Sequence, residues 1–241
     1  MKVKCNKCSK IVDVKDNVCE KLGIDKTDFE KIFLCKECRK SKFIRKFEYN
    51  WCEISKMPGL PEWFIEKYKD KVDWSWISTC QKLSEEFIEK YADKVNWDQI
   101  STYQELSEQF IEKYADKVNW NNISIHQKLS EAFIEKFKDK VNWSLISAFQ
   151  KLSESFIEKY KDRVDWDQIS MCQELSEQFI EKYADKVNWF SISGFQKLSP
   201  EFIVKYLDKI TFYIYKNPYY ETYPDSIKLL LKQKFQGKEV K

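Results

Sequence analysis

The fold is decided by the stretch Leu83-Ser-Glu-Glu-Phe-Ile-Glu-Lys-Tyr-Ala-Asp-Lys-Val-Asn-Trp-Asp-Gln-Ile-Ser-Thr-Tyr-Gln-Glu105, which is one unit of a 23-residue repeat. Each unit has a leucine at its first position and a tryptophan at a second fixed position. The leucines are Leu60, Leu83, Leu106, Leu129, Leu152, Leu175 and Leu198, and the tryptophans are Trp51, Trp74, Trp97, Trp120, Trp143, Trp166 and Trp189. A fixed period of this length is typical of repeat architectures, in which each unit is one supersecondary element that stacks on its neighbours.

Each unit contains two helix starts. Ser84 is a good N-cap for an amphipathic first helix of about three turns, and Asn96 is a good N-cap for a second, shorter helix. The apolar face of the first helix is expected to carry Phe87, Ile88, Tyr91 and Val95, and that of the second to carry Trp97, Ile100 and Gln104. Helices this short are marginal alone, so each pair must be stabilised by its neighbours. The sequence therefore predicts an all-α fold, an α-solenoid of two-helix repeats.

Three regions follow from the pattern. The repeats occupy residues 50–210, where the aligned tryptophans are expected to be core rather than a stacking surface for bases. Residues 1–49 form a separate module, with a short strand expected at residues 11–14. Residues 211–241 are expected to cap the C-terminal end, with an amphipathic helix from Asp225 to Phe235.

Two Cys-x-x-Cys pairs in the first region predict a metal site. Cys5 and Cys8 are followed by Cys35 and Cys38. Two such pairs can surround one tetrahedral zinc ion, and a site closed by four thiolates is normally structural rather than catalytic. The alternative is a pair of disulfides or unligated thiols, which an intracellular chain disfavours. The order of elements resembles zinc-ribbon and treble-clef modules, so one structural Zn²⁺ is predicted.

Composition and charge exclude several classes. Aromatic residues make up 16% of the chain and can build a core despite 34% charged residues, which argues against disorder. No apolar run is long enough to cross a membrane, and the first five residues contain no apolar signal segment, so an intracellular protein is expected. Net charge is +6 over residues 1–50, −7 over 51–204 and +4 over 205–241. An acidic array is a poor track for phosphate backbones and favours a protein or basic peptide partner.

The second helix combines fixed and changing positions. Its motif Trp-x-x-Ile-Ser-x-x-Gln keeps the named residues, while its four gap positions differ between repeats and fall on one arc of the helix. A constant frame with a variable face is how solenoids build binding surfaces. The candidate partner-binding residues are Trp76, Tyr103, Ile125, His126, Leu145, Phe149, Met171, Phe190 and Phe195. The alternative is neutral drift after duplication, since residues 97–119 and 166–188 differ at two positions only.

The consensus Leu-Ser-Glu-x-Phe-Ile-Glu-Lys-Tyr-x-Asp-Lys-Val-Asn-Trp-x-x-Ile-Ser resembles the 23-residue repeats of proteins from giant DNA viruses of amoebae. This resemblance covers residues 50–210. It implies a viral or virus-derived origin and no particular activity.

The sequence gives no constellation of residues for catalysis. The chain has a single histidine, His126, and too few glycines for a phosphate-binding loop. A non-enzyme without a small-molecule substrate is therefore expected. Two binding hypotheses remain: the variable face binds a protein while zinc holds the N-terminal module, or the basic module of residues 1–49 binds nucleic acid while the solenoid recruits another factor.

Overall fold

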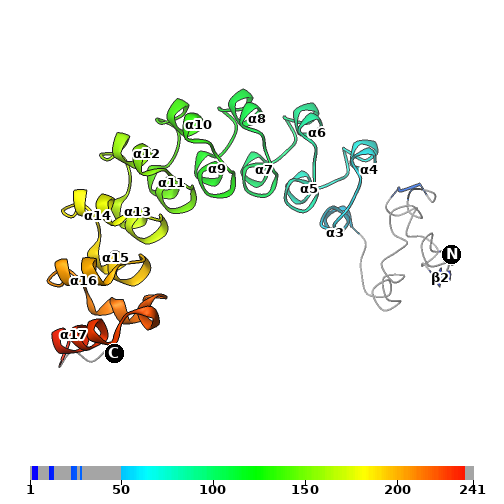
Figure 1. The fold of residues 1–241 in the computed structure, drawn as a ribbon. Helices are drawn as coiled ribbons and strands as arrows, with labels where there is room; N and C mark the ends of the chain where they lie inside the picture. The colour runs from blue at the N-terminus through cyan, green and yellow to red at the C-terminus, as the bar shows by residue number, and fades with distance from the viewer. Residues whose placement is uncertain (1, 5–10, 14–22, 26–27, 29–49, 237–241) are drawn as a thin grey trace. The chain divides into compact units, whose positions relative to one another are not determined.

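The structure, a computed structural model, describes residues 2–4, 11–13, 23–25, 28 and 50–236. It confirms an α-solenoid in which two-helix repeats pack in series (Figure 1). The chain divides into two compact units, residues 1–119 and 120–241. This division lies within the repeat array, between the residues Asn119 and Trp120.

The helices alternate between two types. The first-type helices are α4 (Glu62–Lys67), α6 (Glu85–Lys90) and α8 (Glu108–Lys113) in the first unit, and α10 (Glu131–Lys136), α12 (Glu154–Lys159), α14 (Glu177–Lys182) and α16 (Pro200–Lys205) in the second. The second-type helices are α3 (Trp51–Ser55), α5 (Trp74–Cys80) and α7 (Trp97–Tyr103), then α9 (Trp120–His126), α11 (Trp143–Phe149), α13 (Trp166–Cys172) and α15 (Trp189–Phe195). Within each unit the second-type helices lie side by side in chain order.

The first-type helices begin where the sequence predicts and end earlier. In α6 the Ser84 hydroxyl accepts a hydrogen bond from the N–H of Phe87, which is a standard N-cap. The helix ends at Lys90 because Tyr91 leaves the helical conformation, and a tight turn closed by the Val95 N–H and the Tyr91 carbonyl follows. The prediction of about three turns was wrong: the turn keeps Val95 buried, so the apolar spacing continues after the helix has stopped.

The second-type helices are capped as predicted, and from α5 onward they are the longer of the two types. The Asn96 side chain accepts a hydrogen bond from the N–H of Gln99 and opens α7. The helix runs for 7 residues, against 6 in α6, so the expectation of a shorter second helix was wrong. Ile100 at its centre is fully buried.

Aromatic side chains join each second-type helix to the next first-type helix. The ring of Trp97 stacks on Phe110, with centroids 6.3 Å apart, and tilts against Tyr114 at 4.9 Å. Its Nε1 donates a hydrogen bond to the carbonyl oxygen of Ala92, and the ammonium group of Lys117 covers the ring. The tryptophans are therefore half-buried structural residues that hold consecutive repeats together.

Buried polar side chains connect consecutive second-type helices. The Ser101 hydroxyl donates to the carbonyl oxygen of Trp97 and accepts from the N–H of Asn119, the next helix cap. Gln104 donates from Nε2 to the carbonyl oxygens of Ser78 and Gln81, at 2.9 and 2.8 Å. Its Oε1 accepts from the N–H of Leu83. The fixed Ser and Gln of the motif thus satisfy buried backbone groups of the neighbouring repeat.

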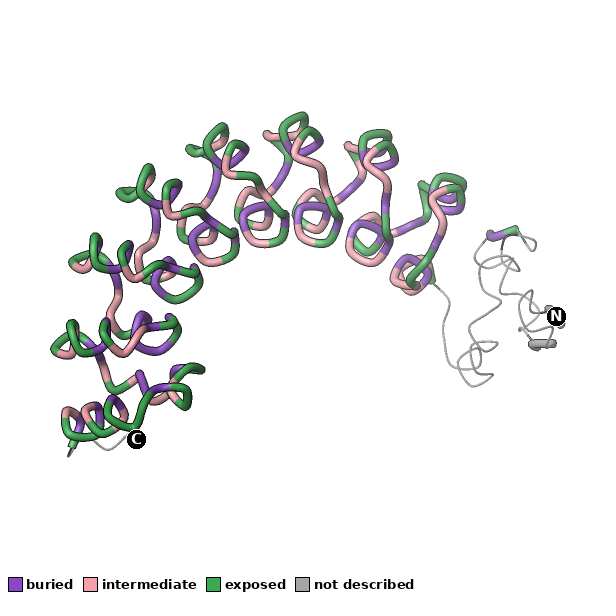
Figure 2. Tube along the Cα trace, viewed as in Figure 1, coloured by how far each residue is buried: buried purple, intermediate pink, exposed green. Residues whose placement is uncertain are grey.

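Charged side chains of the first-type helices form a ladder between repeats. Lys159 binds Glu135 at 2.5 Å, Lys182 binds Glu158 at 2.5 Å, and Lys205 continues the series with Glu181. Figure 2 shows these helices and their turns with much of their length exposed. Exposed pairs of this kind contribute little stability each, so the ladder mainly keeps this side of the repeats polar.

Described residues of the N-terminal region pack on the first repeat. Strand β1 (Lys2–Lys4) pairs antiparallel with β2 (Ile11–Asp13), which agrees with the strand expected at residues 11–14. Ile24 is buried against the core of the first unit. The carboxylate of Asp28 accepts from Lys67 at 2.5 Å and from the Tyr68 hydroxyl at 3.0 Å. This segment therefore covers part of α4.

The C-terminal end replaces the next repeat with shorter elements. These are the 3₁₀ helices η2 (Phe212–Lys216) and η3 (Tyr220–Thr222), followed by α17 (Asp225–Lys234). The helix agrees with the prediction for residues 225–235, and Ile227, Leu231 and Phe235 are buried. Leu230 is half-buried. Among the described residues, no helix combines the length and apolar character needed to cross a membrane.

Candidate protein-binding face

We define the variable face as the four gap positions of each Trp-x-x-Ile-Ser-x-x-Gln motif. The fixed residues of the motif are fully used by the fold. The serine and glutamine form their hydrogen bonds within the repeat stack, and the isoleucine is buried there. The gap positions are not equivalent. The first and fourth gap residues are exposed in most second-type helices, whereas the second and third are mostly half-buried.

A hydrogen bond between two repeats explains the half-buried positions. The hydroxyl of Thr79, a third gap residue, donates to the side-chain carbonyl oxygen of Gln99, a second gap residue of the next helix, at 3.1 Å. The third and second gap positions of neighbouring helices therefore meet each other. Ile125 and Leu145 occupy these positions and are half-buried, so their expected role as exposed anchors must be corrected.

In the first unit the face carries two predicted aromatic residues in different surroundings. Tyr103 is 58% exposed at the end of α7. Trp76 is 37% exposed, and the ammonium group of Lys56 lies 4.6 Å from the centre of its ring. Tyr103 is the more accessible of the two, because Trp76 already has a cation over its ring.

In the second unit the remaining predicted residues line consecutive helices. Phe149 is 58% exposed at the end of α11, and Met171 is 40% exposed on α13. His126 is exposed at the end of α9. The fourth gap position is one of the most exposed positions of the helix.

The C-terminal end of this face is an aromatic cluster, which we define as Phe190, Phe195, Phe212 and Tyr213. The ring of Phe190 stacks on Tyr213 with centroids 4.2 Å apart, and Phe195 meets Tyr213 edge-on at 5.8 Å. Phe190 also meets Phe212 edge-on at 6.1 Å. Phe190 and Phe195 nevertheless remain 42% exposed, so the cluster presents apolar surface to solvent.

Gly194 makes this cluster possible. It occupies the third gap position of α15, directly beneath the ring of Tyr213, and a Cβ atom there would overlap Cδ1 and Cε1 of that ring. In earlier repeats the same position holds a larger side chain, such as Met171. The glycine thus lets η2 place Tyr213 between the two phenylalanines of α15.

Charges in the second unit are distributed unevenly. On the first-type helices, the hydrogen bond from Lys159 lowers the pKa of the Glu135 carboxyl, and the same bond raises the pKa of Lys159. Other lysines directly follow the frame glutamines at the ends of second-type helices. Among the described residues, these lysines have no ion-pair partner. These are Lys128, Lys151 and Lys197, with Glu174 at the corresponding position after α13.

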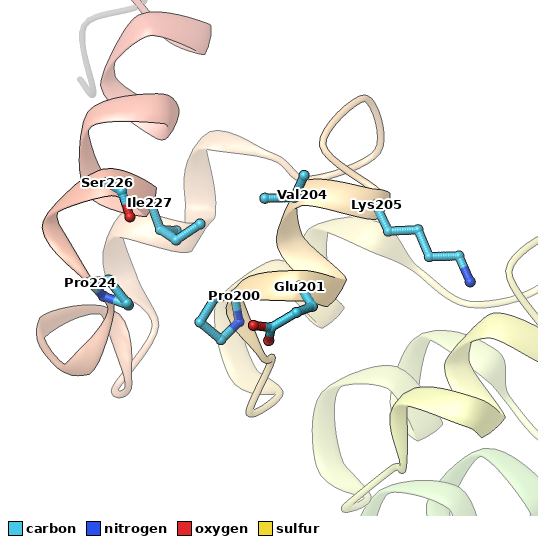
Figure 3. A pocket seen from close by; sticks show the side chains of 7 residues that line it. All are labelled: Pro200, Glu201, Val204, Lys205, Pro224, Ser226 and Ile227. Atoms are coloured by element: carbon cyan, nitrogen blue, oxygen red, sulfur yellow. The ribbon is translucent and has the colours of Figure 1, made fainter.

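A hollow of about 600 Å³ lies elsewhere in the second unit, between α16 and α17. Figure 3 shows Val204 and Ile227 approaching each other across it, while the Lys205 side chain extends away. Val204 stands where earlier repeats have the glutamate of the ion-pair ladder, such as Glu181. The hollow is open, and its polar lining residues are Glu201, Lys205 and Ser226.

Groups with intrinsic reactivity are scattered in the described part of the chain. Burial raises the pKa of the Cys172 thiol, which makes it less nucleophilic. No cluster of His, Cys, Asp and Glu side chains that could hold a metal is found among the described residues. The predicted zinc ligands Cys5, Cys8, Cys35 and Cys38 lie outside those residues.

Sequence reasoning missed half of the aromatic cluster, although a signal was present. Phe212 lies 23 residues after Trp189, and Tyr213 lies 23 residues after Phe190. Continuing the repeat count beyond residue 210 would have placed both in the positions of a further second-type helix. Comparisons of the chain with models of protein families, curated proteins and solved structures find no match.

Proposed function

We propose that the protein is a non-catalytic binding or scaffold protein whose variable face recognises a partner protein. The observation that carries this proposal is the exposure of Tyr103 and Phe149, each 58%, at the same position of helices whose frame needs neither of them. Large aromatic side chains on an exposed surface are typical anchors of protein interfaces.

The contacts around the variable face favour a binding surface over neutral drift of its residues alone. The frame serine and glutamine recur in each motif because they satisfy buried backbone groups of the adjacent repeat. Substitutions at the fourth gap position leave those bonds intact, so this position is free to change with the partner. Neutral drift on exposed sites would favour polar residues, whereas Tyr103, Phe149 and Phe195 are aromatic.

The remaining regions have supporting roles in this proposal. One structural Zn²⁺ on Cys5, Cys8, Cys35 and Cys38 organises the N-terminal module. Ile24 is buried in the core of the first unit, and Asp28 accepts a hydrogen bond from Tyr68, which follows α4. These contacts support a capping role for the N-terminal region. The repeat consensus adds a viral or virus-derived origin to the proposal.

The proposal is tested by capture of proteins from nuclease-treated host-cell extract by the full-length chain. A variant with serine at Tyr103, Phe149 and Phe195 is expected to lose the partner and to keep its helicity and melting temperature. A matched control with serine at Lys138, Glu112 and Lys161, exposed residues of the first-type helices and their turns, is expected to retain it. Equal capture by parent and aromatic variant would contradict the proposal. Nuclease-sensitive capture that requires residues 1–49 and falls steeply with salt would instead favour nucleic-acid binding.

A further inference from the structure

Two lysines lie close in sequence to residues of the aromatic cluster. Lys197 follows the frame glutamine Gln196 two residues after Phe195, and its ammonium group lies 5.8 Å from the ring centre of Tyr219. Lys216 is the last residue of η2 and is exposed. Neither lysine has an ion-pair partner among the described residues, in contrast to Lys182 and Lys205 on the first-type helices.

The carboxylates near the variable face in the second unit already accept hydrogen bonds, or they belong to the repeat before the aromatic cluster. Asp165 caps α13 and also accepts a hydrogen bond from the Ser144 hydroxyl. Asp167 accepts from the side-chain amide of Asn188. Both lie at the N-terminal end of α13, whereas Lys197 lies beyond the C-terminal end of α15. Among the described residues, Glu174 is the carboxylate that follows a frame glutamine in the second unit, and it belongs to the preceding repeat.

We propose that this end of the variable face takes an acidic peptide segment of a partner protein. A large apolar side chain of the segment packs on Phe190, Phe195 and Tyr213, and its carboxylates lie against Lys197 and Lys216. This inference rests on the proposed function and specifies its partner. It reverses the expectation of a basic partner from the net charge of −7 over residues 51–204, because the second unit, residues 120–241, contains 19 Lys and Arg residues against 17 Asp and Glu residues.

The proposal combines two known contributions to recognition. Apolar anchors supply affinity when they leave water, and the exposed cluster offers them a surface in which Tyr213 packs over Gly194 and stacks on Phe190. Uncompensated lysines select partners of opposite charge and speed their association. A basic segment would gain the apolar contacts and meet repulsion from both lysines.

The test is selection of displayed random peptides on the full-length chain. The selected peptides are expected to combine an aromatic or leucine residue with several Asp or Glu residues. Binding of a selected peptide, measured by fluorescence anisotropy, is expected to weaken by about tenfold or more in the variant K197E/K216E. The matched variant K138E/K161E, which changes two exposed lysines on the first-type side, is expected to bind as the parent does.

Lysines near a helix C-terminus also complement the helix dipole, so melting temperatures are measured for both variants. A change in stability without a change in peptide affinity would assign the lysines to that structural role and overturn the inference. Selected peptides that are neutral or basic but still require Phe195 would overturn the acidic partner and leave the proposed function standing. Absence of any peptide that requires Phe149, Phe195 or Tyr103 would overturn both.

Discussion

The side-chain amide of Gln173 donates a hydrogen bond to the backbone carbonyl oxygen of Gln150, at 2.8 Å, and so links the same position of two consecutive repeats. Gln196 repeats this contact with the carbonyl oxygen of Gln173 at 2.7 Å. At the C-terminal end Asn217 repeats it with Gln196 at 2.8 Å. Asn217 follows η2 and lies 21 residues after Gln196, whereas the frame glutamines are 23 residues apart.

This chain of amides predicts that Gln173→Ala is strongly destabilising. The change removes hydrogen bonds to the carbonyl oxygens of Ser147 and Gln150 and to the N–H of Leu152, all in a buried environment. The expected loss in the free energy of unfolding is about 3 kcal/mol. Gln168→Ala in the same helix, at a half-buried gap position, is the control, with an expected loss below about 1 kcal/mol. Urea denaturation that gave the same loss for both would contradict the role of the frame glutamine.

The tryptophans are expected to stabilise the fold rather than to contact a partner. Trp166→Ala removes a ring that stacks on Phe179 and tilts against Tyr183, and we expect a loss of about 3 kcal/mol. Exposed Glu174→Ala should change stability by less than about 0.5 kcal/mol. Partner capture, normalised to the folded fraction, should be unchanged in both variants. A tryptophan variant that keeps full stability and loses its partner would show that these rings belong to the binding site.

Alkaline pH is expected to destabilise the C-terminal end through one tyrosine. Burial raises the pKa of Tyr223 to about 12 from its ordinary value of 10.0. The folded state therefore favours the neutral phenol, and this contribution is complete below pH 10 and is lost as the pH rises toward 12. Denaturation curves across this range should show a smaller decline in stability for Tyr223→Phe than for the parent protein. Parallel declines would mean that the hydroxyl of Tyr223 is accessible to water when the protein is folded.

The N-terminal cysteines are expected to hold about one equivalent of zinc per chain, as measured by elemental analysis. Cys35→Ser removes one of the four thiolates and should lower the zinc content and the stability of the N-terminal region. Cys172→Ser, which changes an exposed cysteine on α13, is the control and should leave the zinc content unchanged. Full zinc content and unchanged melting in Cys35→Ser would contradict the predicted site.

The repeat period, the helix caps and the buried isoleucines could all be predicted from the sequence, because they depend on local spacing. The early end of α6 could not. Val95 keeps its place on the apolar face whether the chain reaches it by helix or by a tight turn from Tyr91. Gln104 was correctly placed on the inner face, but its partners, Ser78 and Gln81, belong to the preceding repeat, and helical periodicity does not show how repeats stack.

The candidate face could be predicted only in part, because local helical spacing is visible in the sequence and the stacking of repeats is not. Tyr103 and Phe149 are exposed at the predicted positions, which follow from the helical phase of the motif. Ile125 and Leu145 share that arc, but each is partly covered at a position where neighbouring second-type helices meet. Contacts across consecutive helices are set by the stacking of repeats, and a single repeat contains no signal for them.

The central claim, that a partner protein contacts the variable face, is tested most directly by photo-crosslinking. A photoreactive phenylalanine analogue is introduced into the full-length chain at Phe149, and separately at the exposed first-type residue Lys161, and each protein is irradiated in cells that express it. We expect the analogue at position 149 to form a crosslink to a distinct protein and the one at position 161 to form none. Crosslinks to a protein from position 161, with none from position 149, would contradict the central claim.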